Sequence, residues 1–176
     1  DQGSANWNGT VSGDTQYLFR VVAANWKVLS AQASAQKPEG ESTSTLTATF
    51  RVQVVAQRGD VYIPNNGFTA TTTGATQISM GTPVITPVSG VETSGSYYIV
   101  RNGQTGVLDV QFAKTPSSWT SGYHRVQLQT MVWDNDSDDA NGQVITTFPG
   151  TVETNTLTNA VYICLLYTSP SPRDRQ

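Results

Sequence analysis

The sequence is poor in cysteine, histidine and charge. Its 176 residues include 1 Cys and 1 His, 13% of them are charged, and the net charge is -3. A single cysteine allows no disulfide framework within the chain, and a single histidine excludes a zinc site built on two histidines. The 10 Lys and Arg residues are scattered, which argues against the clustered basic surface that nucleic acids or anionic membranes attract. No apolar run approaches the roughly 18 residues of a membrane-spanning helix.

Both ends of the sequence are set apart from the predicted domain. The segment from Cys164 to Asp174 resembles a sequencing-library adapter translated in frame, so we expect residues 164–176 to be non-native. A genuine Pro/Ser-rich linker is the alternative interpretation. The sequence starts at Asp1 with neither a basic nor an apolar leader segment. Either a signal peptide has been removed or the sequence starts within a longer protein, and the non-native end favours the second interpretation. We therefore expect residues 1–25 to be an N-terminal strand or linker of a larger protein.

Alternation of apolar and polar residues with a period of two dominates the remaining chain. In Thr45–Val54, Leu46, Phe50 and Val52 face one side, while Thr and Gln residues face the other. Such a strand has one buried and one hydrated face, which is typical of antiparallel sheets. Further strands are predicted at Tyr17–Ala23, Trp26–Ala33, Asp60–Ile63, Gln77–Met80, Tyr97–Arg101, Val107–Ala113, His124–Val132, Val144–Phe148 and Val161–Ile163.

Turn-forming residues separate these strands. The segments Pro64–Gly67, Pro87–Gly95 and Asp134–Gly142 are rich in Gly, Pro, Asn, Asp or Ser. Thr-rich pieces with a weak pattern, Thr69–Ala75 and Thr151–Thr158, are interpreted as edge strands or loops. Short strands joined by such turns predict an all-β, antiparallel β-sandwich of about seven to nine strands over residues 26–163.

Three segments, by their order and by their strand-like residue pattern, resemble segments of a known kind of protein. They are Thr49–Pro64 (TFRVQVVAQRGDVYIP), Tyr97–Phe112 (YYIVRNGQTGVLDVQF) and Gly122–Asp138 (GYHRVQLQTMVWDNDSD). Together they resemble the immunoglobulin-like β-sandwich modules of uncharacterised secreted or surface-anchored bacterial proteins. The resemblance implies an immunoglobulin-like fold and an extracellular or cell-surface location. It includes no catalytic motif, so it transfers no functional residue.

His124 is the only histidine that could serve a nucleophilic mechanism. It lies in a predicted strand, and the sequence has no Gly-x-Ser-x-Gly motif to provide a nucleophile. An imidazole with no identifiable nucleophile to activate does not support a nucleophilic mechanism. We therefore interpret His124 as a residue on the strand surface or half-buried beneath it, and we expect no enzymatic activity and no cofactor.

Four carboxylates lie within six residues at Asp134, Asp136, Asp138 and Asp139. Alternating carboxylates can converge on Ca²⁺, and this start mimics the first half of an EF-hand loop. Asp139 stands where that loop needs Gly, and Ile145 stands where it needs a bidentate Glu. A calcium loop of another type and a solvated acidic hairpin tip both remain open, and the broken motif favours the solvated tip.

Aromatic residues suggest a second candidate site. Exposed aromatic faces stack on sugar rings, and Trp119 in a Ser/Thr-rich loop, with Tyr123 nearby, is the candidate carbohydrate platform. The alternative is burial in the core, where large aromatic residues place most of their area. Burial is the favoured interpretation for Trp26 and Trp133, which adjoin apolar strands.

The tripeptide Arg58-Gly59-Asp60 matches an integrin-recognised sequence. Such short matches arise often by chance, and Gly and Asp also turn the backbone, so a turn is the favoured interpretation. The sequence as a whole predicts a structural or adhesive module, with neighbouring domains of a larger surface protein as partners. The alternative is a carbohydrate-binding accessory module of an extracellular enzyme, with a cell-wall or environmental polysaccharide as ligand.

Overall fold

The computed structural model describes residues 22–36, 44–115, 119–137 and 142–163. Within these ranges the chain is all-β, with eleven strands in antiparallel sheets and no helix, which confirms the predicted fold class. The strands are β1 Ala23–Gln36, β2 Thr45–Gln57, β3 Val61–Pro64, β4 Phe68–Gly74, β5 Val84–Ser89, β6 Glu92–Ser94, β7 Tyr97–Val100, β8 Thr105–Lys114, β9 Gly122–Trp133, β10 Val144–Thr147 and β11 Val161–Ile163. The described part holds no helix that is long and apolar enough to cross a membrane.

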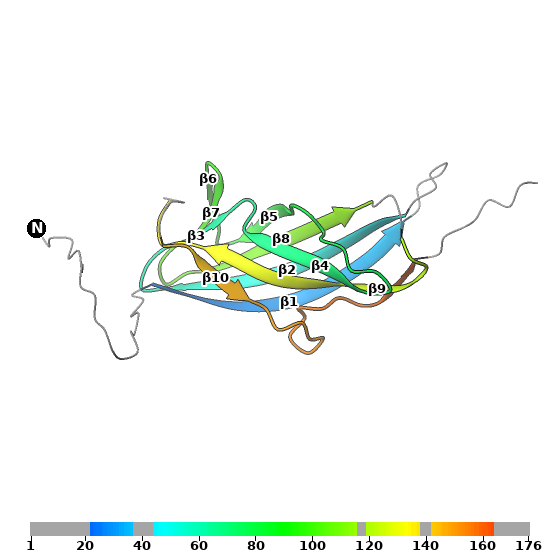
Figure 1. Ribbon diagram of the computed structural model, residues 1–176. Coiled ribbons are helices and arrows are strands. Elements are labelled where there is room, and N and C mark those ends of the chain that lie inside the picture. The colour runs from blue at the N-terminus through cyan, green and yellow to red at the C-terminus, as the bar shows by residue number, and fades with distance from the viewer. Residues whose placement is uncertain (1–21, 37–43, 116–118, 138–141, 164–176) are drawn as a thin grey trace, which may run out of the picture.

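The strands form two larger sheets and one small one. The first sheet has the order β1-β2-β8-β5, and the small sheet has the order β3-β7-β6. In the second sheet β9 is central, with β4 along one edge and β10 and β11 along the other. The long strands run along the longest dimension of the molecule (Figure 1).

The core lies between the two larger sheets and follows the predicted alternation. Phe50 on β2 is paired with Val110 on β8, and both side chains are fully buried. The remaining predicted core residues are buried too: Leu46, Val52, Val54, Leu108, Phe112, Val126 and Leu128. They belong to one hydrophobic cluster that spans both sheets. Burial of these side chains therefore confirms the predicted inward faces of β2, β8 and β9.

Several short elements differ from the prediction of seven to nine strands. The predicted turn at Pro87–Gly95 contains the end of β5 and all of β6, and the Thr-rich segment 69–75 forms most of β4. The predicted strand at Gln77–Met80 forms only an isolated bridge at Ser79. The first described strand, β1, begins at Ala23, before the predicted domain start at residue 26. Residues 1–21 and 164–176, with the predicted linker and adapter-derived tail, lie outside the described residues.

Two asparagine side chains cover the free edge of β1. Asn159 accepts a hydrogen bond from the Ala33 amide (2.7 Å) and donates one to the Ala33 carbonyl (3.0 Å). Asn155 donates to the carbonyls of Val28 and Leu29 at 3.2 and 3.3 Å. An uncovered edge strand presents unpaired backbone groups to other chains. The segment between β10 and β11 satisfies part of this edge through side chains rather than through a further strand.

Candidate functional site

Trp119 does not form the predicted carbohydrate platform. Its side chain is 3% exposed, and its indole Nε1 donates a 2.8 Å hydrogen bond to the Ser44 carbonyl. The ring packs edge-on against His124, with 4.8 Å between ring centroids. A buried ring whose N–H is already bonded cannot stack on a sugar, so the prediction of a displayed Trp119 is wrong. The alternative of core burial describes this tryptophan correctly.

His124 is fully buried, which corrects the prediction of a surface or half-buried residue. Its Nε2 lies 2.9 Å from the Thr120 carbonyl oxygen, and a carbonyl only accepts, so Nε2 carries the proton. The other ring nitrogen, Nδ1, is buried and has no hydrogen-bond partner among the described residues. The alternating pattern of β9 could not reveal this, because the loop at residues 119–121 folds over the strand and encloses the ring.

Tyr123 is exposed, but its aromatic partner is Tyr162 rather than Trp119. The two residues face each other on β9 and β11, with 5.1 Å between ring centroids and 69° between ring planes. Their exposed fractions are 66% and 54%. Sequence analysis missed Tyr162 because nothing local pairs the last short strand with the start of β9. The outer face of this sheet therefore displays two adjacent tyrosine rings.

Asp134 does not belong to a solvated acidic tip. Its main-chain N–H and carbonyl both bond to Tyr62 at 2.8 Å, which extends the pairing past the end of β9. Asp134 is 3% exposed; its Oδ1 accepts from the main-chain N–H of Asn135 at 2.7 Å, and its Oδ2 is buried with no partner in the described part of the chain. Asp136 is exposed, whereas Asp138 and Asp139 lie outside the described residues. In the described ranges no three His, Cys, Asp or Glu side chains gather as a metal-binding group.

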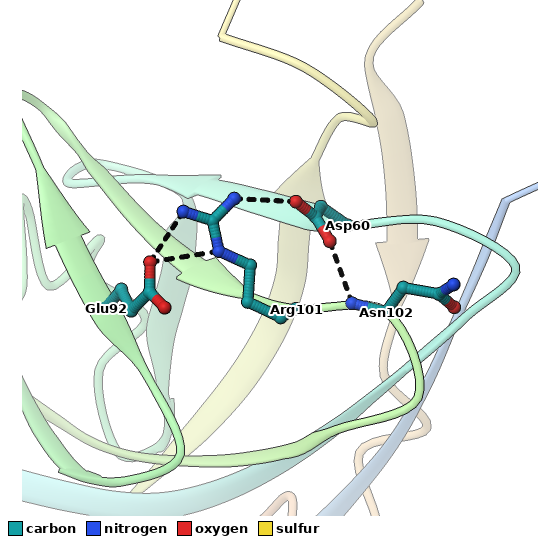
Figure 2. A network of polar contacts seen from close by, with 4 residues as sticks. All are labelled: Asp60, Glu92, Arg101 and Asn102. Atoms are coloured by element: carbon teal, nitrogen blue, oxygen red, sulfur yellow. Dashed lines mark hydrogen bonds and ion pairs between the residues drawn. The ribbon is translucent and has the colours of Figure 1, made fainter.

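The Arg58-Gly59-Asp60 tripeptide lies in the bend that connects β2 to β3, and Arg58 has a φ of 61°. The Asp60 carboxylate accepts hydrogen bonds from the Arg101 guanidinium at 2.7 Å and from the main-chain N–H of Asn102 at 2.8 Å (Figure 2). These hydrogen bonds, with that of Arg101 first, hold the pKa of Asp60 below its usual range. Both carboxylate oxygens are thus engaged within the protein, in agreement with the favoured turn interpretation.

Arg101 is the centre of the network in Figure 2. Its Nε and Nη2 donate to Glu92 Oε2 at 2.9 and 2.6 Å, while Nη1 bonds to Asp60. These contacts raise the pKa of Arg101, with the hydrogen bond to Glu92 as the largest cause. The arginine side chain is 46% exposed, so solvent screens these ion pairs. The network connects β6, β7 and the start of β3, and we interpret it as structural.

A cleft of about 300 Å³ lies beside Trp26, between β1 and the loop before β11. Lys27, Glu153 and Asn155 are among the residues that line it. Trp26 is only partly buried, with its ring 4.5 Å from that of Phe148. The sequence predicted a core position, and this tryptophan lies at the rim of the core. Segments far apart in the sequence form the cleft, so no local motif could predict it.

Comparisons of the chain with family profiles, with characterised proteins and with solved structures found no match. Its chemistry is therefore inferred from its own residues. Two features of the described residues are suited to ligands: the exposed Tyr123–Tyr162 pair on the second sheet and the buried carboxylate of Asp134 at the end of β9.

Proposed function

We propose that the chain is a non-enzymatic structural module, a spacer or adhesive domain of a secreted or cell-surface protein. The observation that carries this proposal is where the described strands begin and end. β1 starts at Ala23 at one end of the long axis, and β11 ends at Ile163 at the opposite end (Figure 1). A module connected in this way adds its full length to a chain of domains. An immunoglobulin-like classification is part of the same proposal.

The pairing of the terminal strands suits a domain under tension. β1 has 14 residues, about 45 Å in extended conformation, and it pairs with β2 along that length. Hydrogen bonds of an antiparallel pair lie perpendicular to the strands. A pull along the long axis therefore loads the β1–β2 ladder in shear, so that many bonds must break together.

The opposite end of the domain is loaded in the same manner. β11 pairs antiparallel with β9 from Val161 to Ile163, so a pull on Ile163 along the strand also shears its hydrogen bonds. Asn159 lies just before β11 and binds both backbone groups of Ala33 on β1. This asparagine connects the two terminal strands directly, and it transfers load between them.

The experiment is single-molecule stretching of the full chain in tandem copies. Pulling through the two ends loads the β1–β2 pair in shear. The control attaches one handle at the N-terminus and the other at residue 58. Because Ala23 pairs with Gln57, both handles then pull at the same end of the β1–β2 hairpin. The hairpin opens from that end, and its hydrogen bonds break one pair at a time. We expect a markedly higher unfolding force in the end-to-end geometry. Equal forces in the two geometries would contradict the spacer proposal.

The second candidate function is carbohydrate binding, and the exposed Tyr123–Tyr162 pair favours it. A tyrosine ring offers an apolar face with a polar tip, which suits the C–H face and hydroxyls of a pyranose. Affinity electrophoresis in gels that contain cell-wall polysaccharides tests this function. Retardation of the native chain that is lost in Tyr162→Ala, but retained in a control such as Ile145→Ala, would support a binding module. Unretarded migration in every gel would leave the spacer as the better account.

A further inference from the structure

The carboxylate of Asp134 is buried in an incompletely satisfied state. Its Oδ2 atom has no hydrogen-bond partner among the residues that the structure describes, although Asp134 is only 3% exposed. A buried ionised carboxylate is costly unless it is paired, hydrogen-bonded or bound to a metal. Both main-chain groups of Asp134 are bonded to Tyr62, which fixes the backbone that carries this carboxylate.

Both oxygens of this carboxylate and the side-chain oxygen of Asn135 lie near the position that a Cβ atom of Gly142 would occupy. A Cβ atom built on Gly142 would lie 3.2 Å from Asp134 Oδ1, 3.6 Å from Asp134 Oδ2 and 3.7 Å from Asn135 Oδ1. Three side-chain oxygens thus lie within 3.7 Å of a single point. Gly142 has a φ of 94°, which disfavours other residues. A larger side chain at this position would fill the space that the oxygens face.

We propose that Asp134 and Asn135 bind a hard divalent cation of the Ca²⁺ type in the connection between β9 and β10. Carboxylate and amide oxygens are the donors that Ca²⁺ takes in proteins, usually together with water. Asn135 is exposed, so water can complete the coordination shell from that side. A cation there provides the missing partner for Asp134 Oδ2. This inference is independent of the spacer proposal.

The small number of protein ligands predicts weak binding. Calcium sites of extracellular modules have dissociation constants of about 10⁻⁴–10⁻³ M. Because only the folded chain brings these oxygens together in this arrangement, an ion bound there stabilises the folded state selectively. At a tenfold excess of Ca²⁺ over the dissociation constant the folded state is favoured about 11-fold, which raises the Tm of a domain of this size by about 3–6 °C.

The experiment has two parts. The full chain is first freed of metal with a chelator and then titrated calorimetrically with CaCl₂ up to about 20 mM. Its thermal unfolding is also measured with and without Ca²⁺. The variants are Asp134→Asn, Asn135→Ala and, as a control that removes one negative charge from another loop, Glu153→Gln. We expect saturable binding by the native chain and by Glu153→Gln. Asp134→Asn should not bind, and Asn135→Ala should bind several-fold more weakly.

Thermal unfolding in chelator provides an independent readout. Asn keeps the shape of Asp but removes the buried negative charge, so Asp134→Asn should unfold no earlier than the native chain when Ca²⁺ is absent, and its Tm should not respond to the ion. A flat titration of the native chain would overturn the proposal and assign Oδ2 to an ordered water molecule. Binding that survives in Asp134→Asn would also overturn it. If Asp134→Asn does not fold, Asn135→Ala replaces it as the test, and an unchanged affinity of that variant for Ca²⁺ would overturn the proposal.

Discussion

Truncation of Phe50 is the sharpest test of how the two sheets share one core. The side chain is fully buried on β2, and its ring lies edge-on to that of Phe112 on β8, with 6.2 Å between centroids. Truncation of a buried Phe to Ala costs about 3–5 kcal/mol through lost transfer free energy and the cavity that remains. For a domain of this size the loss corresponds to a fall in Tm of roughly 6–20 °C.

The matched control is Thr49→Ala on the same strand. Thr49 points to the opposite face of the sheet, where it is partly exposed, so its truncation should cost well under about 1 kcal/mol. Urea denaturation of both variants, with the slope of the transition compared, measures the two free energies of unfolding. A one-residue shift of register exchanges the faces of a strand. Similar costs for Phe50→Ala and Thr49→Ala would therefore refute the assigned register.

Three local contacts allow further predictions. The pKa values of Asp60 and Asp109 are both lowered, chiefly by the hydrogen bonds that the two carboxylates accept from arginine. Each carboxylate therefore stabilises the fold at pH values above its unfolded pKa near 3.8, and this stabilisation is lost as the pH falls through the lower folded pKa. Acid unfolding measures this contribution, and stability should depend less steeply on pH in the Asp60→Asn and Asp109→Asn variants. Gly74→Ala should lower the Tm more than Gly95→Ala does. Both glycines have a positive φ, but a Cβ atom at position 74 would clash with the carbonyl oxygen of Tyr123, whereas one at position 95 would meet no atom within 4 Å. Asn159→Ala should cost about 0.5–1.5 kcal/mol in urea denaturation, since it removes the side chain that bonds both backbone groups of Ala33. An unchanged midpoint would show that water replaces the side chain.

The local pattern of the sequence was sufficient to predict the class of the fold and the inward face of its main strands. The alternation in Thr45–Val54 allowed one buried face, and that face is buried. This information is local, because neighbouring side chains of a strand point to opposite sides whatever the strand pairs with. The last strand, Val161–Ile163, was predicted with its observed bounds for the same reason.

Tertiary contacts determine which residues meet and which side chains remain exposed. Trp119 is buried because its loop folds against His124 and Ser44, and neither contact leaves a periodic signal in the sequence. Tyr162 joins Tyr123 only because β11 pairs with the start of β9. The burial of Asp134 likewise depends on Tyr62, far away along the chain. Strand pairing and loop closure determine these positions, and the composition and residue spacing of the sequence do not predict them.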